Sequence, residues 1–450
     1  MRTPHGTEPL PAHVRVAIIG AGFGGIGAGI RLRQADRTDF VILERADAVG
    51  GTWRDNTYPG CTCDVPSHLY SFSFAPNPDW SHGFSRQPEI WAYLDAVTDR
   101  YGIRPYIRFG TELAEARWDR AGAQWQLRTS RGDMTADVVI AAAGPLSTPS
   151  LPDIPGLDTF PGPVFHSARW DHRADLAGKR VAVIGTGASA IQIVPAIQPV
   201  AGRLTLFQRT PAWVMPRRDR RITGAEKWLY RQVPLTGRMV RLGLHASREL
   251  LAVGFKPNTE LVAAGLAKVD GSTLTAQDGT PRDADVIIFA TGFHVIDLPL
   301  ARRITGAGGV TLAQTWGEDM RALRGTTIAG FPNLCLLIGP NTGLGHNSLI
   351  HIIEAQLGYA LDYLDALDRL GAAALDASPQ AEQRWCDDVQ RRMASTVWAT
   401  GCMSWYLNSA GRNPTLWPGL VGGFRRATRR LDLAEYRVIP AGADGPAGVR

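Results

Sequence analysis

Two glycine-rich segments carry the most specific chemical signal in the sequence. VRVAII (residues 14–19) has the pattern of a buried strand and runs directly into GAGFGG, in which Gly20, Gly22 and Gly25 have G-x-G-x-x-G spacing. A helical stretch follows, and then a second strand that ends at Glu44. Such glycines allow a tight turn and close approach to a pyrophosphate, and the acid accepts hydrogen bonds from ribose hydroxyls. This order predicts a βαβ unit that binds a dinucleotide.

The same order recurs in a second segment. The strand pattern KRVAVI is followed by GTGASA, in which Gly185 and Gly187 repeat the spacing, and then by a helix and the strand RLTLFQR. The second strand of this unit ends at Arg209, where the first unit has Glu44. A guanidinium at that place suits the 2′-phosphate of a nucleotide. We therefore expect FAD at the first unit and NADPH, rather than NADH, at the second.

These units divide the chain. Residues 1–150 are expected to form the first segment of an FAD-binding domain, and the proline-rich stretch 145–156 reads as a linker. Residues 157–292 then form the NADPH-binding domain, and residues 293–450 return to the FAD-binding domain with amphipathic helices at 351–370 and 380–397. The predicted fold class is α/β, with two Rossmann-like dinucleotide-binding domains in a glutathione-reductase-like two-domain architecture.

Composition excludes several other classes of protein. The chain has 450 residues, of which 44% are hydrophobic and 20% charged, and this is the profile of a globular protein rather than of a disordered or fibrous one. It has no apolar run long enough for a membrane span and no secretory leader pattern, so a cytoplasmic location is expected. The net charge of +6 comes mainly from scattered arginines, apart from clusters at 217–221 and 425–430. Without a nucleic-acid-binding signature, no nucleic-acid partner is expected.

The five cysteines predict neither a disulfide framework nor a metal site. Cys61 and Cys63 are separated by one residue, which is the wrong spacing for a zinc knuckle and a strained one for a redox disulfide beside a flavin. We interpret them as free thiols. A flavin disulfide reductase is thereby disfavoured.

Further motifs resemble those of class B flavoprotein monooxygenases, and within them type I Baeyer–Villiger monooxygenases. FPGPVFHSARWD matches F-x-G-x-x-x-H-x-x-x-W-P/D and contains His166 and Trp170. GGTWRDNTYPGCTCD matches G-G-x-W-x-x-x-x-Y-P-G-x-x-x-D and ends at Asp64. FQRTPAW, FATGF, GPNTGLGHNS and SWYLNSAGRNPTLWPG are also similar, so the resemblance covers nearly the whole chain.

The resemblance implies that NADPH reduces FAD and that the resulting C4a-peroxyflavin inserts one oxygen atom of O2 into a small ketone to give an ester or lactone. It implies a catalytic position for Asp64 near the reactive edge of the flavin, and a role for His166 and Trp170 in coupling NADPH binding to rearrangement. The candidate cofactor-binding residues, besides the glycines named above and Asp64, are Glu44, Arg45, Gly51, Thr52, Trp53, Tyr70, Ser189, Gln192, Arg209, Thr210, Thr291 and Asn347.

The sequence departs from the family pattern at one place. Family members carry a Lys-Arg pair before the last ATG strand, whose arginine pairs with the aspartate that matches Asp64. Here ELLAVGF (249–255) runs almost directly into KPNTELV, so that stretch is missing. Arg54, Arg86 and Arg217 are candidates for the charge. Oxygenation of sulfur or nitrogen, another biosynthetic oxidation, and cofactor binding without oxygenase activity therefore stay open as alternatives.

Overall fold

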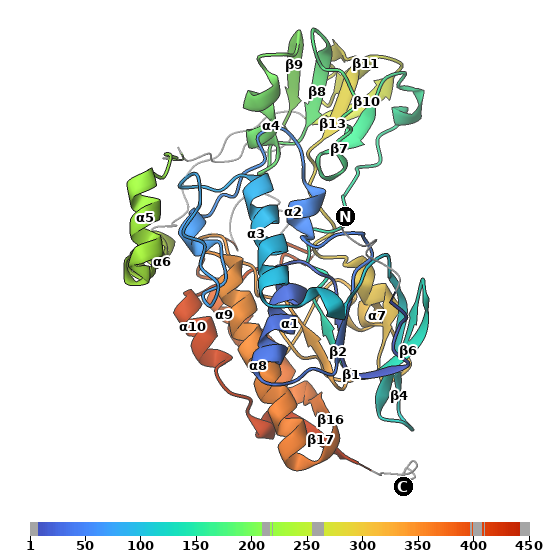
Figure 1. Cartoon of the computed structure of the whole chain (residues 1–450). Helices are drawn as coiled ribbons and strands as arrows, with labels where there is room; N and C mark the ends of the chain where they lie inside the picture. Colours follow the sequence, from blue (N-terminus) through green and yellow to red (C-terminus); the bar gives the residue numbers. More distant parts are fainter. Residues whose placement is uncertain are drawn as a thin grey trace.

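The computed structural model describes residues 8–208, 217, 219–253, 265–396, 398, 407–408 and 410–441. Figure 1 shows two sheet-containing halves stacked on one another: the strands of the first glycine-rich unit lie in the lower half and those of the second in the upper half. Two groups of helices complete the molecule. The helices from α8 (Leu349–Leu370) to α10 (Val421–Ala427) lie along the lower half, and α5 (Gly224–Gln232) with α6 (Pro234–Val253) stand at its edge.

An eight-stranded sheet forms around the first unit, in the order β14-β4-β5-β6-β1-β2-β3, with β15 paired to β6. Its strands are β1 (His13–Ile19), β2 (Phe40–Leu43), β3 (Ile107–Arg108), β4 (Leu113–Asp119), β5 (Gln124–Thr129), β6 (Gly132–Ala141), β14 (Ile304–Thr305) and β15 (Leu334–Leu336). The β6-β1-β2-β3 pairs are parallel, whereas β4, β5 and β6 form an antiparallel meander. Because β14 and β15 follow the second unit in the chain, the polypeptide returns to the first sheet.

A four-stranded parallel sheet in the order β7-β13-β8-β9 forms around the second unit. It comprises β7 (Val164–His166), β8 (Arg180–Ile184), β9 (Arg203–Phe207) and β13 (Val286–Phe289), and a three-stranded antiparallel sheet of β10 (Leu266–Asp270), β11 (Thr273–Ala276) and β12 (Pro281–Asp283) lies beside it. The predicted α/β class with two Rossmann-like units is confirmed.

The remaining elements are helices and one small sheet. The α-helices are α1 (Phe23–Gln34), α2 (Thr52–Asp55), α3 (Gln87–Arg100), α4 (Ala190–Ile197), α5 (Gly224–Gln232), α6 (Pro234–Val253), α7 (Leu312–Trp316), α8 (Leu349–Leu370), α9 (Pro379–Met393) and α10 (Val421–Ala427). The 3₁₀ turns are Ser67–Leu69, Arg104–Tyr106, Leu157–Thr159, Ser167–Arg169, Pro299–Arg303 and Leu433–Glu435, and β16 (Ala372–Ala377) pairs with β17 (Tyr436–Pro440).

The apolar side chains on both faces of β1 explain why this strand lies inside its sheet. Val16 and Ile18 pack into the cluster that contains residues of α1 and α8, while Ala17 and Ile19 pack into the cluster on the other face. A strand that is buried on both faces needs a continuous apolar run, as VRVAII has. The two glycine turns that follow β1 and β8 are therefore held on rigid, buried strands.

The C-terminal helices differ slightly from expectation. α8 agrees with the predicted helix at 351–370, but α9 ends at Met393 rather than at 397. The hydroxyls of Ser395 and Thr396 donate to the carbonyls of Arg392 and Met393, and such local hydrogen bonds compete with helix continuation.

Candidate active site between the two glycine turns

The turn after β1 leaves no room for side chains. Gly20 has a φ of +102°, its N–H donates to the Leu43 carbonyl at 2.8 Å, and a Cβ there would lie 2.9 Å from the Ala142 carbonyl oxygen. A Cβ on Gly25 would lie 1.8 Å from the Gly20 carbonyl oxygen. α1 therefore begins directly against the end of β1, with its first N–H groups at the carboxyl edge of the sheet, where an anionic pyrophosphate binds well.

The turn after β8 repeats this geometry. Gly185 has a φ of +105°, its N–H donates to the Phe207 carbonyl at 2.9 Å, and a Cβ there would lie 2.5 Å from the Ala290 carbonyl oxygen. A Cβ on Gly187, by contrast, would meet no protein atom within 4 Å. An open glycine beside a crowded one fits a turn that keeps space for a ligand. Both turns thus fit a dinucleotide.

Glu44 is positioned at the first turn as the sequence predicts. It is buried at the end of β2, and its carboxylate accepts the N–H groups of Ala21 at 2.7 Å and Ala46 at 3.0 Å. Arg54 pairs with it at 3.1 Å. Arg45 points elsewhere and donates to the Ser147 carbonyl at 3.1 Å.

The segment after Glu44 folds over the first turn. Gly51 has a φ of +51°, and a Cβ on it would lie 3.2 Å from the Cα of Gly22. α2 begins next, at Thr52, and Trp53 donates from its indole nitrogen to the Tyr70 hydroxyl at 3.0 Å. The two rings pack edge to face, with centroids 5.4 Å apart and an interplanar angle of 75°. This aromatic pair adjoins the loop that carries Asp64.

Asp64 is exposed on a loop that the second unit holds in place. The side chain of Gln192, on α4, accepts the N–H of Thr62 at 2.9 Å and donates to the Thr62 carbonyl at 3.0 Å. A Cβ on Gly60 would lie 2.6 Å from the Gln192 carbonyl oxygen, so glycine is needed for this close approach. Asp64 therefore lies between the two glycine turns, two residues from the bridge.

The thiols beside Asp64 are not poised for redox chemistry. Cys61 and Cys63 are buried and free. Burial raises the pKa of Cys61 to about 11 and that of Cys63 well above its usual value, so neither forms a thiolate near neutral pH.

Arg217 is the candidate cation that bonds to the backbone one residue before Asp64. Its guanidinium donates to the Cys63 carbonyl at 3.3 Å and lies 5.4 Å from the centre of the Phe84 ring. Arg54 is committed to Glu44 and Asp55 instead. The backbone of Arg86 forms an isolated antiparallel bridge with that of Thr62.

His166 and Trp170 lie where the chain crosses between the units. His166 ends β7, and the residues between them form a 3₁₀ turn, so the two side chains do not share the face of an α-helix. The His166 ring contacts Phe293, with centroids 5.6 Å apart, and Trp170 contacts Phe165. Burial lowers the pKa of His166 to about 4, so its ring is neutral near pH 7.

Two crossing segments meet beside His166. The N–H of Ser150 donates to the Gly292 carbonyl at 2.9 Å, and the N–H of His294 donates to the Thr148 carbonyl at 3.1 Å. The Thr291 hydroxyl donates to the Ser150 carbonyl at 2.6 Å. Thr291 therefore joins the outgoing and returning connections, which is the place for a hinge.

Ser189 is half-buried immediately before α4, beside the second turn. Arg209 and Thr210 lie outside the described residues.

Asn347 is engaged by α6, which the sequence interpretation overlooked. It is buried, and its amide nitrogen lies 2.8 Å from the Glu249 carboxylate and 3.0 Å from His245 Nδ1. His346 contacts the same carboxylate at 3.2 Å, and Arg241 donates to the carbonyls of His68 and Ser71. The spacing of 241, 245 and 249 is the sequence signal that could have revealed this face.

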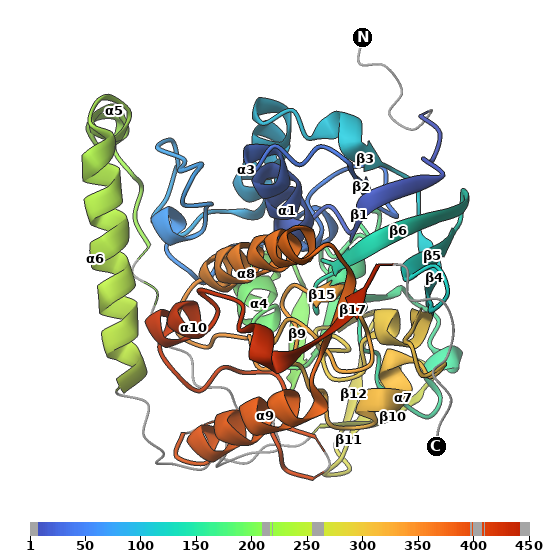
Figure 2. The same ribbon diagram turned by 90° about the horizontal axis from the view of Figure 1, so that it is seen from below.

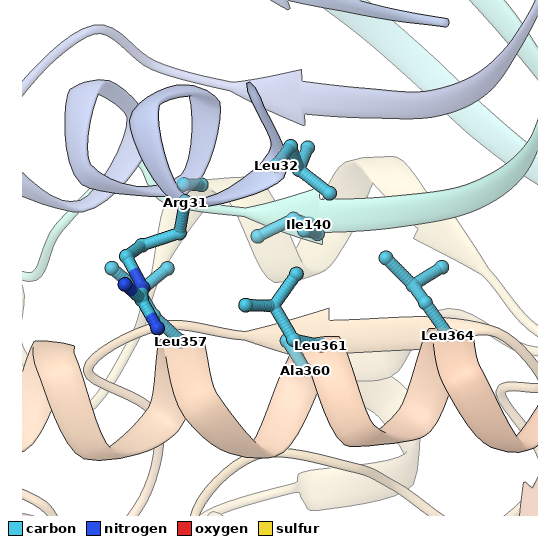
Figure 3. A pocket seen from close by; sticks show the side chains of 8 residues that line it. Arg31, Leu32, Ile140, Leu357, Ala360, Leu361 and Leu364 are labelled. Carbon is cyan, nitrogen blue, oxygen red and sulfur yellow. The ribbon is translucent and has the colours of Figure 1, made fainter. Parts of the chain in front are cut away.

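The described residues contain a small apolar pocket elsewhere. Figure 3 shows it between α1 and α8, where Arg31 borders a wall of aliphatic side chains that includes Leu32, Ile140, Leu357 and Leu364. It lacks convergent polar groups and is too small for a substrate, so we regard it as a packing defect rather than as the site. No group of three or more His, Cys, Asp or Glu side chains in the described ranges is arranged to hold a metal ion.

We predict that the α6–α8 contact loses stability in acid. Burial, with Arg241, His245 and Arg425 nearby, lowers the pKa of His351 to about 3. The unfolded chain takes up its proton near pH 6.5, so the stabilisation from neutral His351 is complete above that pH and is lost toward pH 3. At pH 5 the expected loss is roughly 2 kcal/mol.

Urea unfolding between pH 7.5 and 5 measures this loss. His351→Phe keeps the ring shape and removes the titrating nitrogens, so its free energy of unfolding should fall less steeply. Equal slopes for the two proteins would show that His351 does not contribute.

Comparisons with known proteins agree with this arrangement. Residues 13–226 match the family described as flavin-binding monooxygenase-like. A Baeyer–Villiger monooxygenase of Streptomyces coelicolor is 55% identical over 487 positions, which cover 96% of this chain and 94% of that protein. One from Pseudomonas aeruginosa is 41% identical and covers 96% and 93%.

Solved structures of monooxygenases also superpose on this chain. Cyclohexanone monooxygenase from Rhodococcus sp. Phi1, bound to NADP⁺, superposes with a TM-score of 0.81 at 27% identity and covers 96% of this chain and 100% of its own. An oxidized steroid monooxygenase bound to NADP has a TM-score of 0.81 at 28% identity, with coverage of 96% and 100%. With its two glycine turns and the Asp64 loop between them, this chain belongs to the Baeyer–Villiger monooxygenases.

Proposed function

We propose that the protein uses NADPH, FAD and O2 to convert a ketone into an ester or lactone. The observation that carries this proposal is the Gln192 bridge, which fixes the Asp64 loop between two glycine turns of equal geometry. Bound FAD would provide the chemistry that involves O2, and bound NADPH would provide the hydride. The protein's own residues bind, orient and enclose these groups.

The first turn would hold FAD. Gly20, Gly22 and Gly25 would leave space for the pyrophosphate and Glu44 would accept hydrogen bonds from the ribose, while Arg45 would act through its bond to the Ser147 carbonyl. Gly51, Thr52 and Trp53 would cover the cofactor from the segment that folds over the turn, and Tyr70 fixes the Trp53 indole through their 3.0 Å hydrogen bond.

The second turn would hold NADPH. Gly185, Gly187 and Ser189 line the entrance to α4, and Arg209 with Thr210 would bind the 2′-phosphate. Thr291 would act through the connection that it ties to Ser150. Asn347 is a positioning residue in this account, because its amide is already bonded to Glu249 and His245.

Asp64 and Arg217 would set the charge beside the flavin. Arg217 reaches the Cys63 carbonyl, one residue from Asp64. A cation there would stabilise negative charge that develops on oxygen, as the missing Lys-Arg segment would do in relatives. This assignment replaces the three candidates from the sequence with one.

His166 and Trp170 would transmit NADPH binding to the inter-unit connections. His166 is neutral and its ring faces the Gly292 backbone, so a shift of the returning connection would change the contacts of this side chain. Its contact with Phe293 lies beside the crossing at residues 148–150 and 292–294. We propose 1–150, 157–292 and 293–450 as the corresponding domain segments.

The location that we propose is the cytoplasm, because buried free thiols such as Cys335 and Cys386 suit a reducing compartment. In the described part of the chain, no helix combines the length and apolarity that crossing a bilayer requires.

A second activity, oxygenation of sulfur or nitrogen, stays a candidate because of one observation. The alignment with the Streptomyces relative runs over 487 positions, more than the 450 residues of this chain, so the relative has residues without a counterpart here. The sequence has 12 residues between Val253, the last residue of α6, and Leu266, the first of β10, and the Lys-Arg segment would lie in this interval.

A panel of ketones and sulfides distinguishes these functions. We expect NADPH oxidation to rise when ketones are added and esters to appear in the product. Sulfoxides without esters would favour the second activity, and NADPH oxidation that yields only hydrogen peroxide would exclude both.

We predict that Gln192→Ala uncouples the two units without unfolding the protein. The variant loses both hydrogen bonds to Thr62, so the Asp64 loop is no longer fixed. Product formed per NADPH should fall about tenfold, in line with the loss of about 1.4 kcal/mol of positioning energy. FAD content should be unchanged. Gln198→Ala, an exposed position at the end of the same helix, should resemble the wild type.

Product analysis with NADPH counted in the same reaction makes this measurement. Wild-type coupling in Gln192→Ala would contradict the bridging role.

A further inference from the structure

The helix pair α5–α6 has an unusual distribution of side chains. On α6, the exposed fractions of Leu235, Met239 and Leu242 are 62%, 64% and 68%. Their spacing of four and three residues puts them on one face of the helix. On α5, the exposed fraction of Trp228 is 61%. Figures 1 and 2 both show α5 and α6 at the edge of the molecule, with no other element drawn on the outer side of α6.

Three polar side chains of α6, those of Arg241, His245 and Glu249, contact the body of the protein. Arg241 bonds to the carbonyls of His68 and Ser71, and Glu249 accepts the N–H of Val421 at 3.1 Å as well as bonds from residues 346–347. A surface helix of a globular protein normally buries its apolar face and exposes its charged one. In α6, by contrast, three large apolar side chains are exposed while Arg241 and Glu249 bond to the rest of the protein. This distribution suits an outer face that contacts apolar material.

The charged side chains near the outer face of α6 indicate what kind of partner could bind there. Arg238 is exposed among the leucines, and the described residues give it no ion pair. The acid of α5, Glu226, is already paired with Arg220 at 2.6 Å. α10, bonded to α6 through Val421, carries the exposed Arg425 and Arg426, and the exposed Arg429 and Arg430 follow directly after it.

A second copy of the chain fits this charge poorly. In a two-fold dimer the same patch meets itself, so the two Arg238 side chains would enter one seam without an acid to pair with. An anionic lipid surface meets both features: apolar side chains with a tryptophan enter the interface, and arginines bind lipid phosphates.

We propose that the outer face of α5–α6, with the α10 arginines, docks the enzyme onto an anionic membrane surface. The contact is peripheral: Leu235, Met239, Leu242 and Trp228 lie at the level of the headgroups. α6 also bonds to the His68–Ser71 segment that follows the Asp64 loop, so docking places the site close to lipid-dissolved apolar substrates.

The test is sedimentation of the FAD-loaded enzyme with vesicles. We expect binding to vesicles of phosphatidylcholine with a third phosphatidylglycerol, and weaker binding to pure phosphatidylcholine or in 0.5 M salt. The triple variant Leu235→Ser, Met239→Ser, Leu242→Ser should bind at least about tenfold more weakly. Leu151→Ser, which changes an exposed leucine on the linker, is the matched control and should bind as the wild type does.

Other results overturn the proposal. Absence of binding to anionic vesicles at low salt would do so, and so would equal binding by wild type and triple variant. Analytical ultracentrifugation gives a third: a wild-type dimer that the triple variant lacks would assign the face to a second copy. Oxidation of NADPH in solution should be equal in all three proteins, which shows that the variants are folded.

Discussion

Gly25→Ala should yield a protein without flavin. The added Cβ would lie 1.8 Å from the Gly20 carbonyl oxygen. The two nearest atoms both belong to the Gly20 backbone, so a rotation of a side chain cannot relieve the clash. The turn must open, which separates the start of α1 from the end of β1 and removes the pyrophosphate site. We expect the free energy of unfolding to fall by roughly 3 kcal/mol and FAD content to fall below about a tenth of wild type.

Absorbance at the flavin band and thermal unfolding measure these effects. Gly22→Ala serves as a milder variant, because its Cβ would meet only the Gly51 Cα, at 3.8 Å. It should fold and bind FAD weakly. Gly358→Ala, in the middle of α8 with no atom within 4 Å of the new Cβ, should keep full flavin and equal or higher stability. Full flavin content in Gly25→Ala would refute the assignment of the first turn.

Gly187→Ala should weaken NADPH alone. Its Cβ would meet no protein atom within 4 Å, so the folded protein accepts it. A loss of affinity can then arise only from contact with the bound coenzyme, because this glycine keeps the space for the pyrophosphate. We expect the Kd for NADPH to rise about tenfold to a hundredfold, while FAD content and thermal stability stay unchanged.

Titration of the oxidised, FAD-loaded enzyme with NADP⁺, which cannot reduce the flavin, isolates binding from chemistry. Gly224→Ala is the matched control, since its Cβ would also meet no atom within 4 Å and it lies at the start of α5. If NADP⁺ binds Gly187→Ala as tightly as the wild type, the coenzyme does not lie on the second turn.

The sequence was sufficient for the nucleotide-binding parts of the fold. A buried strand that runs into spaced glycines has one structural solution, and the predicted strand at 14–19 agrees with β1 at 13–19. Both turns also need glycine for tertiary packing, because a Cβ on Gly20 or Gly185 would strike the Ala142 or Ala290 carbonyl. Local spacing encodes these features.

Contacts between segments that are far apart in the chain could not be predicted from the sequence. The sequence assigns Gln192 to the coenzyme site. Its hydrogen bond to the Thr62 backbone depends on how α4 packs against a loop 130 residues away in the chain. His166 is the last residue of β7 and Trp170 follows the 3₁₀ turn at Ser167–Arg169, an arrangement that their spacing of four residues does not reveal. The polar inner face of α6 escaped notice because each charged residue finds its partner in a different part of the chain.

The central claim is that this site inserts one atom of O2 into a ketone. Its most direct test is a reaction of the FAD-loaded enzyme with NADPH, a ketone and ¹⁸O2, followed by mass spectrometry of the product. The account predicts an ester or lactone with one ¹⁸O atom in the ring or ester position, formed in proportion to the NADPH consumed. Recovery of unchanged ketone across the panel, with all ¹⁸O in hydrogen peroxide, would contradict it.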